Sequence, residues 1–400
     1  MKDALAPRTV RRVRRAAGRA AIKNKMQFMA TAVKGLEDVA GAELRELGAE
    51  IIRKAGGRVE FRGSLETLYK TNLAARCINR VFIIIHRANV ECLDDIYREC
   101  REVDYSWIIS KNQSFGVRAK RIGEHPFKSP EIASTVGRAI TESFAESEGE
   151  RLKVNLDMPD VEFHALLREK EFILTVNTTG DSLHKRGYRE YQHYASIKTT
   201  LASSLIKFSG WKPSFSFLDP MCGGGTIPIE AVLMAKKKTN TRDFAFRKLK
   251  IHNEELYVEI VRRMKEKEIE KPNVKIAGMD ISSKHLEGAI RNAKNAGVLS
   301  FIEFIRGDAR KLSKYIKFSP EFIVVNPPYG IRSSRKRIIG ALYRDFLRSL
   351  REISCGSTLT AVTAAIKEFK SACEANEIEI TEERSVMYGN LPAEVFKCSI

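Results

Sequence analysis

The segment FSFLDPMCGGGTIPIEAVLMA, residues 215–235, limits the fold of this chain more than any other. A short apolar strand ends at Asp219, and three consecutive glycines then precede a helix. Glycines let the backbone approach a ligand at a helix N-terminus, where the first amides have no helical partner. Apolar strands and helices then alternate to about residue 365. This alternation predicts an open parallel sheet with a ligand crevice at the carboxyl ends of its strands.

The spacing of the glycines narrows the class of ligand. It matches neither the G-x-x-x-x-G-K-[ST] phosphate loop nor the G-x-G-x-x-G dinucleotide pattern, so a nicotinamide-dependent dehydrogenase is disfavoured. No lysine follows the loop, and Asp219 and Pro220 before it suit a ligand that carries an amino group. The alternative is a glycine-rich turn with a purely structural role.

Two further acids end predicted strands. Asp280 closes VKIAGMDIS, where it can accept hydrogen bonds from both ribose hydroxyls of an adenosine. Asp308 closes FIEFIRGDAR and is placed for the exocyclic amine of adenine. Asp280 lies farther from the loop than the ~20 residues of a simple unit. We attribute this distance to an insertion, the lysine-rich and helical segment 236–272.

The strand FIVV is followed by Asn326, Pro327, Pro328 and Tyr329, which we call the NPPY segment. The Asn326 side-chain carbonyl and the Pro327 backbone carbonyl can each accept a hydrogen bond, and the two prolines stiffen this elbow by fixing φ. The alternative is a plain Pro-Pro turn.

Basic residues suggest a polyanionic partner. The net charge is +19 and the sequence pI about 9.6, which favours nucleic acid over a merely lysine-rich surface. Cations that we expect to bind phosphates follow the NPPY segment; they are Arg332, Arg335, Lys336 and Arg337. Residues 1–25 form a basic arm that either binds an RNA backbone or is a solvated tail.

Several classes of protein are disfavoured. Seven scattered cysteines without a C-x-x-C pair fit reduced cytosolic thiols, and neither cysteines nor histidines show the spacing of a metal site. No apolar run is long enough for a membrane helix, and the N-terminus lacks the apolar core of a secretory signal. We therefore expect a cytoplasmic protein without a metal.

The N-terminal half predicts two smaller units. The pattern of residues 26–105 predicts the order strand, helix, strand, helix, strand, which is typical of a ferredoxin-like α+β domain. Ser64 is the predicted N-cap of the second helix. The next block has a strand, a basic loop and a helix that can start near Ser129. Candidate RNA contacts in this block are Lys120, Arg121 and Lys128.

The ordered motifs resemble a known family. Asp219-Pro220 with the glycine loop, Asp280, Asp308 and the NPPY segment look like the motifs of amino-group methyltransferases that use S-adenosylmethionine. GVRAKRIGEHPFKSPEIASTVGRAI and LHKRGYREYQHYASIKTTLA are similar to segments of the THUMP-containing RNA guanine-N2 methyltransferases. The layout resembles the archaeal-type tRNA enzymes that make N2-methylguanosine at acceptor-stem position 6.

The resemblance implies an α/β fold with three domains: a ferredoxin-like domain (26–105), a THUMP RNA-binding domain (106–182) and a C-terminal Rossmann-like methyltransferase domain (211–400). It implies that the linker 183–210 contributes to the cofactor site, and that a monomer binds the acceptor end of tRNA through THUMP. The S-adenosylmethionine site that it implies consists of Ala195, Ser196, Asp219, Met221, Cys222, Gly223, Gly224, Gly225, Thr226, Asp280, Ile281, Asp308, Ala309 and Asn326. The catalytic residues would be Asn326, Pro327, Pro328 and Tyr329.

The resemblance also implies a chemistry for the NPPY segment. The exocyclic amine of a nucleobase is a poor nucleophile because its lone pair is conjugated into the ring. The Asn326 side-chain carbonyl and the Pro327 backbone carbonyl can accept hydrogen bonds from that amine and hold its lone pair toward the sulfonium methyl group. Tyr329 can stack on a base extruded from its helix, and the segment suits guanine, adenine or cytosine amines alike.

Two other hypotheses about the function remain open. The first keeps the chemistry but changes the substrate, to a ribosomal-RNA guanine or to an adenine N6. The second is an RNA-binding assembly factor whose methyltransferase fold is catalytically silent. The basic arm has no counterpart that we can place in the family.

Overall fold

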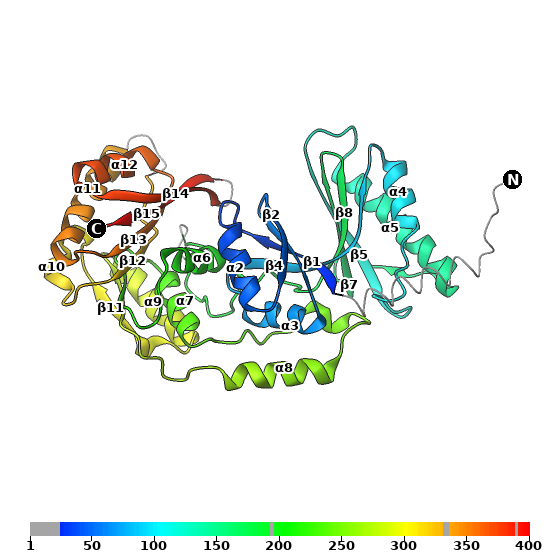
Figure 1. Cartoon of the computed structure of the whole chain (residues 1–400), viewed down its shortest axis with the longest axis horizontal. Helices are drawn as coiled ribbons and strands as arrows, with labels where there is room; N and C mark the ends of the chain where they lie inside the picture. Colours follow the sequence, from blue (N-terminus) through cyan, green and yellow to red (C-terminus); the bar gives the residue numbers. More distant parts are fainter. Residues whose placement is uncertain (1–24, 193–195, 331–335, 389–390) are drawn as a thin grey trace.

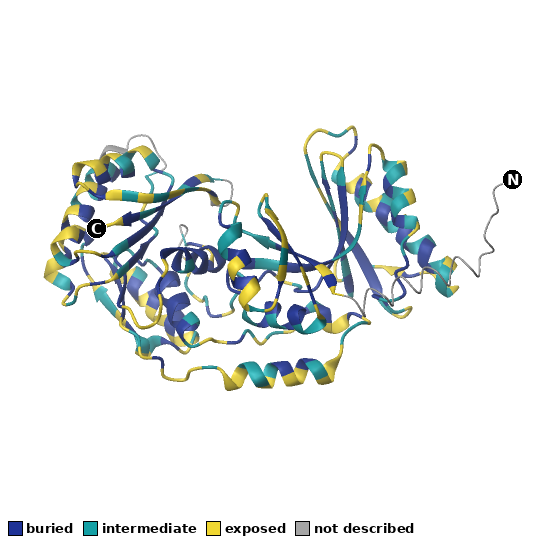
Figure 2. Cartoon of the chain, viewed as in Figure 1, coloured by how far each residue is buried: buried dark blue, intermediate teal, exposed yellow. Residues whose placement is uncertain are grey.

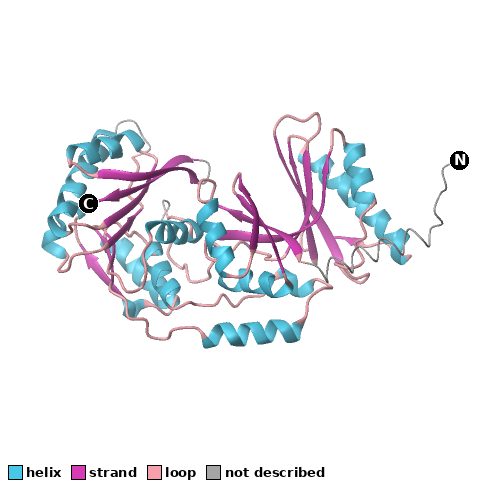
Figure 3. Ribbon diagram, viewed as in Figure 1, coloured by secondary structure: helices cyan, strands magenta, loops and turns pink. Residues whose placement is uncertain are grey.

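The computed structural model describes residues 25–192, 196–330, 336–388 and 391–400. The predicted basic arm therefore lies, except for Lys25, outside the described residues. Figures 1 and 3 show an elongated molecule with a sheet at each end of the described chain and helices packed against both sheets.

The N-terminal sheet has eight strands in the order β2-β3-β1-β4-β8-β7-β5-β6. The strands are β1 (Met26–Ala32), β2 (Glu50–Ala55), β3 (Arg58–Gly63), β4 (Ile78–Asn89), β5 (Ser114–Ile122), β6 (Lys153–Val154), β7 (Val161–Arg168) and β8 (Glu171–Asn177). The helices beside it are α2 (Glu37–Glu46), α3 (Leu65–Ala74), α4 (Leu93–Arg101) and α5 (Ser129–Glu148). The start of α3 confirms the predicted cap, because the Ser64 hydroxyl accepts a hydrogen bond from the Thr67 amide at 3.3 Å.

The two N-terminal units share this one sheet. Strand β4 of the first unit pairs antiparallel with β8 of the second, from Phe82 opposite Asn177 to Asn89 opposite Glu171. Helix α4 packs on α5, where the Arg138 guanidinium lies over the Tyr97 ring. A ladder of backbone hydrogen bonds therefore joins the two units, which the sequence did not predict.

The C-terminal sheet has seven strands in the order β11-β10-β9-β12-β13-β15-β14. The strands are β9 (Phe217–Asp219), β10 (Ile276–Asp280), β11 (Ile302–Arg306), β12 (Phe322–Val325), β13 (Thr358–Thr363), β14 (Glu379–Tyr388) and β15 (Leu391–Ser399). The first five in this order are parallel, and the β13–β15 and β15–β14 pairs are antiparallel. The strand order reverses between β9 and β12, so the ligand crevice of such a sheet lies at their carboxyl ends.

Helices cover both faces of this sheet. They are α6 (Thr199–Ser209), α7 (Thr226–Ala235), α9 (Ser283–Asn295), α10 (Leu312–Tyr315), α11 (Lys336–Ile353) and α12 (Ile366–Ala375). Successive strand residues point to opposite faces, so Phe217 packs with α6, α7 and α9 while Leu218 packs with α10, α11 and α12. The central strands β9, β10, β12 and β13 are buried, as are α6 and α7, which Figure 2 shows in dark blue. Short 3-10 turns add η2 (Leu299–Phe301) and η3 (Ala309–Lys311).

The segment 236–272 is only partly helical. It contains the 3-10 turn η1 (Ala245–Lys248) and α8 (Glu254–Glu266), which runs below α3 in Figure 1. Phe246 and Tyr257 pack against Tyr69 of α3, with ring centroids 4.8 and 5.5 Å apart. The segment therefore crosses from the methyltransferase domain and completes the core of the ferredoxin-like domain. Within the described residues, no helix is long and apolar enough to span a membrane.

Candidate active site

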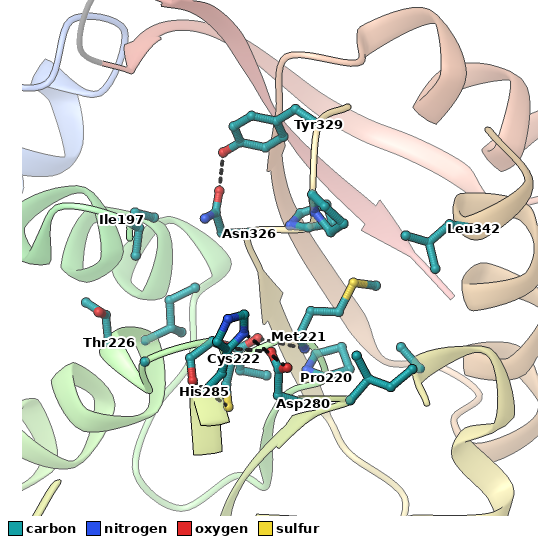
Figure 4. Close-up of a pocket in the computed structure, with 18 of the residues that line it drawn as sticks. Ile197, Pro220, Met221, Cys222, Thr226, Asp280, His285, Asn326, Tyr329 and Leu342 are labelled. Carbon is teal, nitrogen blue, oxygen red and sulfur yellow. Dashed lines mark hydrogen bonds and ion pairs between the residues drawn. The ribbon is translucent and has the colours of Figure 1, made fainter. Parts of the chain in front are cut away.

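A cavity of about 860 Å³ opens at the carboxyl ends of the parallel strands. Figure 4 shows Met221, Cys222 and Asp280 on one side of it and Asn326 with Tyr329 on the other. The strand-end residues predicted from the sequence therefore meet in one place. Its size lies within the ~300–1,000 Å³ that is usual for ligand pockets.

The glycine loop needs its glycines at two positions. Gly223 has φ +52° and Gly225 has φ +76°, a left-handed conformation that side chains disfavour. Gly225 is also the residue before α7, and a Cβ there would lie 2.9 Å from the Ala289 Cβ of α9. Glycine therefore permits both the turn and the close packing of two helices beneath the cavity.

Asp280 holds the glycine loop from the neighbouring strand. One carboxylate oxygen accepts a hydrogen bond from the Gly223 amide at 2.9 Å, and the other accepts one from the Ser282 amide at 2.9 Å. The His285 ring lies 3.5 Å from the same carboxylate. Each carboxylate oxygen can accept a further hydrogen bond from a ligand.

Asp219 and Asp308 differ in their surroundings. Asp219 is 1% exposed and accepts a hydrogen bond from the Met221 amide at 3.2 Å; burial raises the pKa of its carboxyl well above the ordinary value. Asp308 is paired with the Arg310 guanidinium at 2.7 Å, and the hydrogen bonds from Arg310 lower its pKa. Asp308 is therefore ionised near neutral pH, whereas ionisation of Asp219 is opposed by its burial.

The NPPY segment leaves β12 at the mouth of the cavity. The Tyr329 hydroxyl donates a hydrogen bond to the Asn326 side-chain oxygen, as Figure 4 shows. The Pro328 carbonyl accepts a hydrogen bond from the Tyr343 hydroxyl of α11 at 2.9 Å. Both contacts fix the shape of the segment around the space where a base could enter.

Most of the predicted cofactor and catalytic residues line this one cavity. They are Ser196, Asp219, Met221, Cys222, Gly223, Gly224, Thr226, Asp280, Ile281, Asp308, Ala309, Asn326, Pro327, Pro328 and Tyr329. Gly225 does not line it, because that residue packs against α9. Ala195 lies outside the described residues.

Further residues line the cavity that the sequence did not single out. They are Ile197, Ile227, His285, Gly307, Arg310, Gly330, Ile339 and Leu342. Gly307 directly precedes Asp308, so its place in that motif could have identified it. Pro220, which the sequence paired with Asp219 in the loop motif, lines the cavity as well. Ile339 and Leu342 come from α11, and their spacing is that of any amphipathic helix.

Three of the candidate RNA contacts lie away from the cavity. Lys120 and Arg121 lie on β5, and Lys128 precedes α5, at the far end of the molecule from β12. Arg332 and Arg335 lie outside the described residues, and Lys336 and Arg337 form the first positions of α11. Their roles stay predictions.

The residues of the cavity fit S-adenosylmethionine. The three acids supply acceptors, and the amino group, the ribose hydroxyls and the adenine amine of that molecule are donors. Among the described residues, no group of three or more His, Cys, Asp and Glu side chains could hold a metal ion.

Comparison with known proteins agrees with this site. Residues 186–393 match the RMKL-like methyltransferase domain, residues 27–82 the RlmL ferredoxin-like domain, and residues 91–177 the THUMP domain. The tRNA (guanine(6)-N2)-methyltransferase of Methanocaldococcus jannaschii is 42% identical over 93% of this chain and 99% of its own length.

Two solved structures are similar over the whole described fold. A possible methylase from Clostridium difficile 630 superposes with a TM-score of 0.86 at 27% identity, covering 94% of this chain and 98% of that one. The protein SMU.472 in complex with SAH superposes with a TM-score of 0.83 at 25% identity, covering 93% and 97%. These matches confirm the predicted three-domain fold and an S-adenosylmethionine-dependent methyltransferase. The chain belongs to the family of THUMP-containing methyltransferases that includes the archaeal tRNA (guanine(6)-N2)-methyltransferases.

Proposed function

We propose that this enzyme methylates the exocyclic N2 amine of a guanosine at position 6 in the acceptor stem of tRNA. The observation that carries the proposal is the single cavity in which the strand-end acids face the NPPY segment. The archaeal relative that is 42% identical, and is named for that reaction, supports the choice of base and position.

The residues divide into two groups around the cavity. Asp219, Asp280 and the glycine loop would bind S-adenosylmethionine, and Asp308 would accept a hydrogen bond from its adenine. The cofactor supplies an electrophilic methyl group on a sulfonium centre, so the protein has mainly to position and polarise the amine.

Asn326 and Pro327 would do this positioning. The Asn326 side-chain oxygen and the Pro327 carbonyl accept hydrogen bonds from the guanine amine, hold its lone pair toward the methyl group and stabilise the positive charge that develops on nitrogen. In-line alignment can contribute effective molarities of up to ~10⁵–10⁸ M. The methylated nitrogen is far more acidic than the free amine, so water can take the proton.

Tyr329 would change partners when a base enters. Its hydroxyl donates to the same Asn326 oxygen that the substrate amine needs. Stacking of the Tyr329 ring on an extruded base would release that oxygen. A tyrosine in this place therefore occupies the acceptor only until the substrate arrives.

The N-terminal half would select the tRNA. A-form RNA offers side chains little base information in its deep groove, so recognition by shape and phosphates is expected. Lys120, Arg121 and Lys128 on the THUMP domain would contact the acceptor end, with Arg332, Arg335, Lys336 and Arg337 beside the flipped nucleotide. The continuous sheet joins the two N-terminal domains at a fixed distance. A fixed distance suits a region that binds the acceptor end and so sets which nucleotide reaches the active site.

The test is methyl transfer from labelled S-adenosylmethionine to separate pools of unmodified tRNA and ribosomal RNA. The RNA is then digested and the labelled nucleoside identified. We expect N2-methylguanosine from tRNA, lost when position 6 is changed to adenosine with its partner changed to uridine. Label in ribosomal RNA or on adenine would show that the enzyme has a different substrate from the one proposed. Cofactor binding without label in any RNA pool would indicate a catalytically silent RNA-binding protein.

A further inference from the structure

The NPPY segment is supported from behind by a buried side chain of α11. Tyr343 is fully buried, and its hydroxyl lies 2.9 Å from the Pro328 carbonyl and 2.9 Å from the Thr363 hydroxyl. Thr363 is the last residue of β13 and is also fully buried. Its hydroxyl oxygen accepts a hydrogen bond from the Ala365 amide at 2.9 Å.

These contacts can be ordered in only one direction. The Pro328 carbonyl is an acceptor, so the single Tyr343 proton is donated to it. The Tyr343 oxygen then accepts from the Thr363 hydroxyl, whose own oxygen accepts from the Ala365 amide. Burial raises the pKa of the Tyr343 hydroxyl, which therefore stays protonated, and so remains a donor, at every working pH.

Backbone geometry explains why this one carbonyl matters. The two proline rings fix φ at Pro327 and Pro328, and a following proline restricts ψ at Pro327. The ψ angle of Pro328 is the remaining soft torsion, and it sets the direction in which Tyr329 leaves the segment. Rotation about ψ turns the Pro328 carbonyl, so the hydrogen bond that this carbonyl accepts from Tyr343 holds the torsion.

Helix α11 also forms part of the cavity wall. Ile339 and Leu342, four and one residues before Tyr343, both line the cavity. The same helix thus bounds the substrate space and carries the hydroxyl that holds the NPPY segment. A change in the hydroxyl would alter the orientation of Tyr329 without removing any group from the cavity.

We propose that Tyr343 and Thr363 are positioning residues that fix the Pro328 carbonyl and thereby aim Tyr329 at the substrate base. The proposal rests on the function proposed above. Neither residue lines the cavity. Both act through the NPPY segment, so they should affect the chemical step and the stacking of the base, while cofactor affinity should not depend on them.

Tyr343→Phe removes the hydroxyl and keeps the packed ring. We expect kcat to fall about 10- to 100-fold, as small misplacements of reacting groups do, while KM and Kd for S-adenosylmethionine stay within about twofold. Thr363→Val should also lower kcat, but by a smaller factor. Thr363→Ser keeps the hydroxyl, so its kcat should match that of the wild type. Tyr69→Phe is the matched control: Tyr69 is equally buried and its hydroxyl is bonded to His252, far from the cavity, so kcat should not change.

A second readout follows the base itself. 2-Aminopurine at the target position of the stem is quenched by its stacked neighbours, and extrusion restores its fluorescence unless the base then stacks on Tyr329. The bound tRNA should therefore be brighter with Tyr343→Phe than with the wild-type enzyme, at equal tRNA binding. Asn326→Ala is assayed alongside. An inactive Asn326→Ala with wild-type kcat and quenching in Tyr343→Phe would overturn the positioning role alone. Wild-type activity in Asn326→Ala would overturn the proposed function and the inference with it. If Tyr343→Phe does not fold, the Thr363 pair decides: equal kcat in Thr363→Val and Thr363→Ser overturns the proposal.

Discussion

The carboxylate of Asp280 accepts a hydrogen bond from the Gly223 amide at 2.9 Å, across the gap between two neighbouring strands. The acid at the end of β10 therefore shapes the loop after β9 as well as facing the cavity. Its second oxygen is bonded to the Ser282 amide, which fixes the carboxylate plane. One side chain thus joins the loop predicted to bind the methionine end of the cofactor to the site predicted for its ribose.

Asp280→Ala should lower the affinity for S-adenosylmethionine about 10- to 100-fold. The expected loss corresponds to one hydrogen bond to a charged group, which contributes about 1.5–3 kcal/mol. Isothermal titration calorimetry measures it directly. Asp157→Ala, at an exposed position of the THUMP domain, is the control and should bind normally. Unchanged affinity in Asp280→Ala would remove Asp280 from the site.

Asp219→Asn should stabilise the ligand-free protein increasingly as the pH rises. Burial raises the pKa of Asp219, so the folded state binds more protons than the unfolded state above the usual Asp value of about 3.9. Stability of the wild type is therefore lost as pH rises from that value toward the raised pKa. The asparagine side chain does not ionise, so burying it has no cost that grows with pH. Its side-chain oxygen can still accept a hydrogen bond from the Met221 amide. Thermal unfolding between pH 4.5 and 7.5 should show a widening gap in Tm, and a constant gap would contradict the account.

Asn292→Ala should weaken cofactor binding about tenfold although Asn292 is outside the cavity. Its side-chain oxygen accepts from the Glu190 and Tyr191 amides, and its NH2 donates to the Tyr191 and Gly224 carbonyls at 2.9 Å each. Asn292 thereby connects the linker to the glycine loop. Without its side chain the Glu190 and Tyr191 amides lose their acceptor, and a buried amide left unpaired costs about 1–3 kcal/mol.

The control for that prediction lies on the same helix. Asn295 makes an exposed hydrogen bond to Glu190 at 3.1 Å, so Asn295→Ala should bind the cofactor like the wild type. Calorimetry compares the two variants. Equal cofactor affinities of the two variants would show that cofactor binding does not depend on the contact of Asn292 with the linker.

Arg76→Met should lower the free energy of unfolding by about 3–5 kcal/mol, the usual cost of breaking a buried ion pair. Arg76 of the ferredoxin-like domain lies 3.3 Å from Glu230, which is fully buried on α7. Glu230 also accepts from Tyr188 at 3.0 Å and Ser203 at 2.9 Å, so it joins the linker to both domains.

Urea denaturation measures that loss. Lys170→Met breaks an exposed pair with Glu91 and should cost under about 1 kcal/mol. A similar, small cost for both variants would show that the buried pair does not hold the domains together.

The parallel sheet and its strand-end residues could be predicted because each follows from local sequence. Apolar strands precede Asp219, Asp280 and Asn326, and a parallel sheet brings their carboxyl ends to one edge. Strand β2 was missed because it is an edge strand with mostly exposed residues, so it lacks an apolar face.

Long-range contacts could not be predicted in the same way. The pairing of β4 with β8, and the packing of Phe246 on Tyr69, join segments about 90 and 177 residues apart. Nothing in either segment alone specifies the other. The role of Tyr343 is hidden for the same reason, since in sequence it is one apolar position of an amphipathic helix.

Replacing guanosine 6 of a tRNA transcript with inosine tests whether the N2 amine is the methyl acceptor. Inosine lacks only the exocyclic N2 amine, so the tRNA keeps its shape and its phosphates. We predict methyl transfer to the guanosine transcript and none to the inosine transcript, with equal binding of both. Methyl transfer to the inosine transcript at the guanosine rate would contradict an N2 amine as the acceptor.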